Sequence, residues 1–236
     1  MSDRANMLAR VRRTVQDTEL EISDAMLDQA IDDAVEVYSK DVPRKTVVDV
    51  SGNGTSIYLI LTILPGYIDG YSVLDKIEYP LTGTSPPTLP PHCYEIQRRP
   101  DGNGNPALYL VFVGGQRPAS SSSFRVVYTI MHLSDCSTIV ASDRIAVSYL
   151  SAAHALDLYA TATMDSIDSS IDADVFDRTA TTERARRAAK MYRDLYREMV
   201  GVDDNDDGGR REVPANTTIS WSRRRRTHEQ PPYLTH

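Results

Sequence analysis

Cysteine, histidine and long apolar runs are scarce in this chain. Its 236 residues include 2 Cys and 5 His. Two cysteines cannot form a disulfide framework, and neither Cys93 nor Cys136 belongs to a Cys-x-x-Cys pair, so we expect two buried or half-buried thiols. No apolar run approaches the roughly 20 residues of a membrane-spanning helix. The charged first residues also lack the apolar core of a secretory signal, so the sequence predicts a protein of a reducing compartment that contacts no membrane.

Positive charge is in the minority. Lys and Arg number 26 against 33 Asp and Glu, which gives a formal net charge of -7. A globally acidic chain is unsuited to coating nucleic acid over its whole surface, because phosphate binding needs clustered positive charge. Residues 202–236 carry as many arginines as acidic residues, so the whole net negative charge belongs to residues 1–201.

Signatures of catalysis are lacking as well. None of the histidines has a partner at the spacing of a metal site or a catalytic triad. The chain has no Gly-x-Ser-x-Gly elbow and no glycine-rich phosphate loop before a helix. His154 falls in a segment that predicts a buried helix, where we expect a hydrogen-bonded core histidine. The sequence therefore predicts no enzyme, no cofactor and no metal site.

Two acidic segments resemble cation sites only in part. The segment Asp203-x-Asn205-x-Asp207-Gly208 copies the first half of a calcium-binding loop, but its twelfth position, which needs a bidentate Glu, is Pro214. Five aspartates between positions 165 and 177 are expected to cap turns in an exposed connection between two helices, because Asp favours caps and turns. We expect neither segment to bind a metal ion.

Two helices are expected at the beginning of the chain. Apolar residues recur three and four positions apart in residues 8–15, which predicts a short first helix whose four arginines are mostly exposed. Ser23 is a good N-cap for a second helix. An apolar stripe along residues 27–38 predicts that one face of this helix is buried, and Pro43 forces the chain out of the helix.

Short β-rich runs separated by turn residues follow, and they predict a small antiparallel sandwich or barrel. Residues 51–54 (SGNG) are expected to form a hairpin-type turn between the first two strands, and residues 101–105 (DGNGN) a second turn. The proline-rich residues 84–91 cannot lie inside a sheet. The expected strands are residues 46–50, 57–63, 73–79, 94–98, 107–113 and 124–131.

Two more helices are expected to close the chain. Asp143 can cap a long helix over residues 144–163, which is apolar nearly all round and is therefore expected at the centre of the helical layer. An amphipathic last helix is expected over residues 182–200, with Gly201 in a C-cap role. The remaining residues offer little apolar surface to bury and are expected to stay disordered in isolation.

The predicted fold class is α+β. A helical layer of about four helices, two N-terminal and two C-terminal, carries an inserted small antiparallel β-domain and an extended C-terminal tail. The expected divisions are residues 1–43 for the first helices, 44–140 for the inserted domain, 141–201 for the closing helices and 202–236 for the tail.

Several segments resemble the head-to-tail adaptor, or connector, proteins of tailed bacteriophages. In that family an N-terminal helical pair ends in a Tyr-Ser-x-x-x-Pro-like stretch, as in residues 38–44, before a β-rich insertion. Residues 75–80 (DKIEYP) of the insertion and 146–153 of the first closing helix look similar as well. So do the Asp-Ala-Asp at 172–174 and the last helix, which is rich in Arg and Tyr. The resemblance covers about residues 5–200 and leaves the tail unmatched.

The resemblance implies a structural protein of the virion neck, made in the cytoplasm of the host bacterium. Such adaptors assemble as a homo-oligomeric ring, usually of twelve copies, beneath the portal protein. They lengthen the channel through which genomic DNA leaves the head and contact other neck or tail-completion proteins. An acidic body suits that role, because a negative lumen would repel DNA and let it slide without sequence-specific binding.

The tail supplies the candidate partner-binding residues. Sparse apolar side chains can act as anchors, and an arginine block can pair with an acidic surface of the portal. The residues expected to clamp the portal are Trp221, Arg223, Arg224, Arg225, Arg226, Tyr233 and Leu234.

Three other classes of function stay open at this point. An enzyme would need a constellation of residues that is not visible in the linear sequence. A nucleic-acid-binding protein would use residues 223–226 directly on phosphate. A β-rich tail or fibre module that binds carbohydrate would need exposed aromatic side chains on the sheet. The candidates for such a surface are Tyr58, Tyr67, Tyr71, Tyr94 and Tyr109, although strand tyrosines are more often half-buried packing residues.

Overall fold

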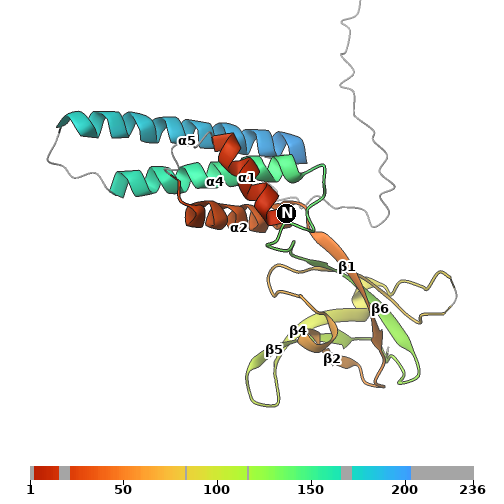
Figure 1. The fold of residues 1–236 in the computed structure, drawn as a ribbon. Helices are drawn as coiled ribbons and strands as arrows, with labels where there is room; N and C mark the ends of the chain where they lie inside the picture. The colour runs from red at the N-terminus through yellow and green to blue at the C-terminus, as the bar shows by residue number, and fades with distance from the viewer. Residues whose placement is uncertain (1–2, 16–21, 83, 116, 166–171, 203–236) are drawn as a thin grey trace, which may run out of the picture.

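The computed structural model describes residues 3–15, 22–82, 84–115, 117–165 and 172–202. They form a layer of helices and a small β-domain that projects from one end of it (Figure 1). Both the first and the last described helix belong to the helical layer, so the β-domain is an insertion. The predicted α+β class, with an inserted antiparallel β-domain, is confirmed.

Four helices make up the helical layer. They are α1 (Asp3–Val15), α2 (Asp24–Asp41), α4 (Arg144–Asp165) and α5 (Asp172–Val200). The central helix is α4, which contacts each of the other three (Figure 1). Its central place agrees with its apolar surface, since a helix that is apolar nearly all round must be covered on most sides.

The predicted caps at the beginning of α2 and at the end of α5 are confirmed. The Ser23 side chain accepts a hydrogen bond from the Met26 amide at 3.3 Å and so caps α2. Gly201 has φ +74°, and its amide donates to the Arg197 carbonyl at 2.8 Å. A left-handed residue after a helix is the conformation that favours glycine, so α5 ends here.

The helical core is one apolar cluster. Val11, Leu27, Ile31, Tyr38 and Val147 each expose less than 2% of their surface. They come from α1, α2 and α4, so this cluster joins three helices. Fully burying a side chain of this size contributes about 1.5–3 kcal/mol.

The β-domain consists of two three-stranded antiparallel sheets. One has the order β1-β6-β3 and the other β2-β5-β4. Tyr58, Phe112 and Phe124 pack edge to face between them, with ring centroids 5.0–5.7 Å apart. The strands are β1 (Arg44–Ser51), β2 (Ile57–Leu59), β3 (Leu74–Glu78), β4 (Tyr94–Pro100), β5 (Pro106–Phe112) and β6 (Ser123–Ile130), with the short helices α3 (Ile60–Ile63) and η1 (Pro91–Cys93).

The predicted hairpin at residues 51–54 is wrong. β1 pairs with β6, and β2 pairs with β5, so this segment carries the chain from one sheet to the other. The Gly52 amide donates to the Ser122 carbonyl at 2.8 Å. A Cβ atom at Gly52 would lie 2.2 Å from the Ala119 carbonyl oxygen, so only glycine allows this close approach. The second predicted turn is confirmed, since residues 101–105 join β4 to β5 as a hairpin.

Two predicted elements have other bounds in the structure. The expected strand 57–63 is divided into β2 and the four-residue helix α3. The last helix begins at Asp172 instead of 182, so three of the aspartates expected in the connection belong to α5. Periodicity cannot separate helix from strand in an apolar run as short as 57–63.

Candidate functional site

The residues predicted to clamp the portal lie outside the part of the chain that the structure describes. This applies to Trp221, to residues 223–226, and to Tyr233 and Leu234. The calcium-like segment 203–208 lies outside it as well. A candidate site must therefore be sought among the helices and the β-domain.

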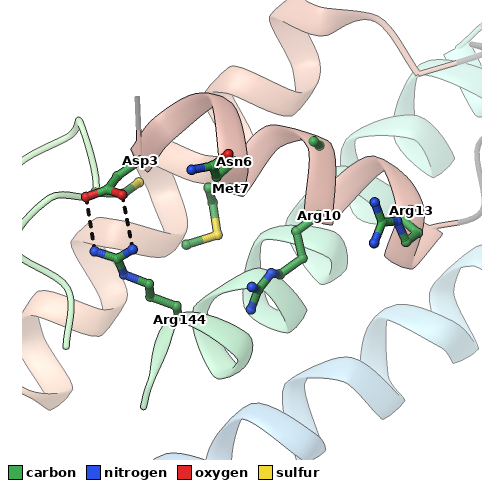
Figure 2. A pocket seen from close by; sticks show the side chains of 8 residues that line it. Asp3, Asn6, Met7, Arg10, Arg13 and Arg144 are labelled. Carbon is green, nitrogen blue, oxygen red and sulfur yellow. Dashed lines mark hydrogen bonds and ion pairs between the residues drawn. The ribbon is translucent and has the colours of Figure 1, made fainter. Parts of the chain in front are cut away.

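A basic cavity lies between α1 and the beginning of α4. Its volume is about 480 Å³. Figure 2 shows its polar residues following one another along α1, with Arg144 from α4 opposite. Its lining residues are Asp3, Asn6, Met7, Ala9, Arg10, Arg13, Cys136 and Arg144.

The charges in the basic cavity do not cancel. The Arg144 guanidinium pairs with both carboxylate oxygens of Asp3, at 3.0 and 3.1 Å (Figure 2). Arg10 and Arg13 are exposed, and neither forms an ion pair with a residue that the structure describes. Two positive charges there are thus left without a partner among the described residues. Arginine offers several N–H donors in a planar fork, which suits the oxygens of carboxylates and phosphates.

The other two arginines of α1, Arg4 and Arg12, form ion pairs with α2. They are half-buried, so their predicted exposure is wrong. The Arg4 guanidinium lies 3.0 Å from Asp28 and 2.6 Å from Asp32, and Arg12 pairs with Asp24. The side chains of Arg4 and Arg12 are only 26% and 24% exposed. Hydrogen bonds to Asp32 and Asp28 raise the pKa of Arg4 above its ordinary value, against the effect of burial. These pairs hold α1 on α2.

Cys136 lines the cavity but is no nucleophile. Its side chain is buried, and burial raises the pKa of the thiol to about 11. The reactive form of cysteine is the thiolate, so this thiol is inert near neutral pH. Cys93 is half-buried, and the expectation of two buried or half-buried thiols is confirmed.

A second polar cluster lies at the junction of the helical layer and the β-domain. The Ser39 hydroxyl of α2 donates to the Val35 carbonyl at 2.6 Å and accepts from the His132 amide at 3.0 Å. The Tyr71 hydroxyl donates to the Ser39 carbonyl. One turn at the end of α2 therefore binds two separate segments of the inserted domain.

The His132 ring bridges the two ends of the insertion. Its Nε2 lies 2.9 Å from the Val42 carbonyl oxygen, which precedes β1. Its Nδ1 lies 3.0 Å from the carbonyl oxygen and 3.3 Å from the hydroxyl oxygen of Thr138. Burial lowers the pKa of His132, so the neutral ring is favoured. The neutral ring carries one N–H, which can donate either to the Val42 or to the Thr138 carbonyl oxygen.

Two tyrosine–carboxylate pairs complete the junction. The Tyr38 hydroxyl donates to Asp143 at 2.8 Å, and the Tyr196 hydroxyl donates to Asp41 at 2.6 Å. Burial raises the pKa of Tyr196 far above its ordinary range, and the hydrogen bond to Asp41 is the second largest cause. Asp143 holds the predicted cap position of α4, where its backbone carbonyl accepts from the Val147 amide at 2.9 Å, but its carboxylate oxygens accept from Tyr38 and Ser142. The junction holds domains together and offers no activated nucleophile.

His154 differs from its expected role as a hydrogen-bonded core histidine. Its Nε2 atom is buried and has no hydrogen-bond partner among the described residues. Burial lowers the pKa of His154, and the nearby Arg193 lowers it further. The neutral ring therefore acts as an apolar side chain with one unsatisfied polar atom.

The β-domain tyrosines do not form an exposed aromatic surface. Tyr58 and Tyr67 are only 4% and 9% exposed, and the Tyr71 hydroxyl is bound to Ser39. Tyr94 and Tyr109 are half-buried. The described residues thus place these rings in packing positions.

Within residues 3–165 and 172–202, apart from the gaps given above, no three His, Cys, Asp or Glu side chains are grouped as metal ligands. The helices of this part of the chain include none that is long and apolar enough to cross a bilayer.

No protein-family model, curated protein or solved structure matches this chain. The cavity could not be predicted from the sequence, because the ion pair between Asp3 and Arg144 in its wall joins residues 141 positions apart. The spacing of Asn6, Arg10 and Arg13, which puts them on one face of α1, is the signal that the sequence does contain.

Proposed function

We propose that this chain is a structural virion protein of the head-to-tail adaptor kind. The observation that carries the proposal is the insertion: α2 leads directly into β1, and the chain returns from β6 to α4 and α5. Two opening helices, a β-rich insertion and two closing helices are the order that the resemblance to adaptor proteins implies. The junction supports a rigid building block, because Ser39 and His132 tie the insertion to α2 at two points.

The proposed assembly is a homo-oligomeric ring of about twelve copies under the portal, the number that the family resemblance implies. In it, the helical layers would pack subunit against subunit, and the lumen would extend the DNA exit channel. The net charge of -7 supports a channel that repels DNA instead of binding it. The protein would then lie in the virion neck, between head and tail, after synthesis in the host cytoplasm.

The portal contact is assigned to the tail. Trp221, Tyr233 and Leu234 would enter apolar pockets, because large apolar and aromatic side chains dominate the energy of small interfaces. Arg223, Arg224, Arg225 and Arg226 would pair with acidic groups of the portal. Such pairs bring specificity and faster association.

Co-sedimentation with the cognate portal ring tests this function. The intact chain is compared with a chain that ends at Gly201 and with an intact chain in which Arg223–226 are all alanine. Binding by the intact chain, with loss in both variants, is the expected result. Equal binding by all three would keep the adaptor and remove the tail clamp. An intact chain that ignores the portal but binds DNA with a steep salt dependence would instead favour the nucleic-acid-binding function.

A further inference from the structure

The basic cavity lies near the place where the described chain ends. The Tyr149 ring of α4 stacks on Tyr192 of α5 with centroids 5.7 Å apart. From Tyr149 back to Arg144 the helix covers about 7.5 Å, and from Tyr192 on to Val200 about 12 Å, at about 1.5 Å per residue. The two helices run in opposite directions (Figure 1), so α5 ends about 5 Å beyond the beginning of α4.

Helix α1 lies against the same part of α5. The Tyr192 hydroxyl donates to the Thr14 carbonyl at 2.9 Å, near the end of α1, while Asp3 at its beginning pairs with Arg144. The Val202 side chain packs on the helical core cluster that also contains Met7, a residue of the cavity wall. The described chain therefore ends at the end of the helical layer where α4 begins, which is also where Arg144 of the cavity lies.

The next residues have the opposite charge to the cavity. Residues 203–207 read Asp-Asp-Asn-Asp-Asp, which we call the acidic run. At about 3.3 Å per residue, its far end can lie roughly 20 Å from Gly201, and the 13 residues of α1 span about 20 Å. Arg10 and Arg13 are thus within its reach.

We propose that the acidic run docks in the basic cavity of its own chain, with its carboxylates paired to Arg10 and Arg13. Both arginines lack a partner among the described residues, and arginine–carboxylate bonds are stronger than bonds between neutral groups. A long nucleic acid fits this place less well, because the acidic body around the cavity repels a polyanion. Four carboxylates tethered two residues from the helix end have a high effective concentration.

Docking would fix the direction in which the tail leaves the helical layer. The chain after residue 207, including the arginine block, would start from the α1 side of the layer. This inference does not depend on the adaptor function, since it concerns contacts within one chain.

Disulfide trapping tests the docking. The chain carries Ala9→Cys, in the exposed wall of the cavity, together with Asn205→Cys in the acidic run, in a Cys93→Ser background. The control pairs Asn205→Cys with Ser121→Cys, an exposed position of the β-domain. Asn205→Cys alone reports reaction with the native Cys136. We expect the cavity pair to form an intramolecular disulfide at least about tenfold faster than the control, through its higher effective concentration.

Charge variants show whether the arginines are responsible. Arg10→Glu with Arg13→Glu should reduce the cavity cross-link to the control rate, and so should 1 M salt, because salt screens exposed charges. Arg184→Glu with Arg187→Glu makes the same change of net charge on exposed residues of α5 and should leave the cross-link unchanged. Equal rates for the two cysteine pairs, cross-links only between chains, or no effect of the Arg10 and Arg13 reversal would each overturn the proposal.

Discussion

Burial gives individual polar side chains of this protein properties that their sequence neighbours do not reveal. Tyr196 is 2% exposed and donates a 2.6 Å hydrogen bond to Asp41, while the buried Nε2 atom of His154 has no partner among the described residues. A satisfied and an unsatisfied polar atom thus lie in the same helical layer. Their opposite effects on the free energy of unfolding can be measured.

Removal of the Tyr196 hydroxyl should destabilise the protein. We expect Tyr196→Phe to lower the free energy of unfolding at pH 7 by about 1–2 kcal/mol, measured by urea denaturation, because a bond to a carboxylate is lost. The raised pKa of Tyr196 means that the unfolded chain releases the phenol proton above about pH 10 while the folded chain keeps it. Stability therefore falls as the pH rises above 10, and the Phe variant should fall less steeply. Parallel pH curves for the two proteins would contradict this assignment.

Replacement of His154 should have the opposite sign. We expect His154→Leu to raise the free energy of unfolding at pH 7 by about 1 kcal/mol, since it removes an unsatisfied buried nitrogen. The pKa of His154 is lowered in the folded state, so the unfolded chain takes up more protons as the pH falls through about 6.5. Stability is lost on acidification, and the variant should lose less of it between pH 7 and 5. The matched control is His92→Leu at an exposed position, which should leave the free energy of unfolding at pH 7 unchanged.

At the scale of elements, capping residues and prolines predict helix bounds well, whereas short apolar runs do not distinguish helix from strand. The bounds of α2 could be predicted because Ser23 caps it and Pro43 stops it. The beginning of α5 could not, because aspartates that favour turns are tolerated in the first turns of a helix, where the helix dipole attracts negative charge. The segment 51–54 has hairpin chemistry, but its partner carbonyls come from residues 118–122, which the local sequence cannot indicate.

Gly52 is the residue on which the crossing between the two sheets depends. We expect Gly52→Ala to cost about 1–3 kcal/mol, the usual effect of overpacking, because its Cβ would lie 2.2 Å from a backbone oxygen. Gly102, in the hairpin between β4 and β5, has no atom within 4 Å of an added Cβ and no positive φ. Gly102→Ala should therefore change stability by less than about 0.5 kcal/mol. Urea unfolding followed by tyrosine fluorescence compares the two, and equal losses would show that the close approach is not a constraint.

At the scale of the whole molecule, the inserted β-domain and the central place of α4 could be predicted, but the contacts that unite the β-domain and the helical layer could not. Composition changes at Pro43 and again near residue 141, so the division into helices, β-domain and helices follows from the order of patterns. The junction bond between Ser39 and His132 joins residues 93 positions apart, and the cavity pair joins Asp3 to Arg144. Charge and hydrogen-bond partners at such separations depend on the folded geometry.

The bond between Ser39 and His132 should stabilise the junction locally. We expect Ser39→Ala to lower the free energy of unfolding by about 1–3 kcal/mol, because the buried His132 amide loses its acceptor. Hydrogen exchange of that amide should accelerate more than exchange within β4 and β5. Ser51→Ala, at an exposed position of β1, is the matched control and should change neither quantity. Uniformly faster exchange throughout the β-domain would show instead that Ser39 acts on the insertion's own stability.

The insertion begins and ends at neighbouring positions. Arg44, the first residue of β1, is the antiparallel partner of Ile130, the last residue of β6, and the pairing continues over eight residue pairs. Arg44 and Ile130, at which the chain enters and leaves the paired strands, are therefore only about 5 Å apart. The β-domain is thus attached through two adjacent antiparallel strands. Strands β1 and β6 can therefore lengthen or shorten together without moving the two ends of the β-domain apart.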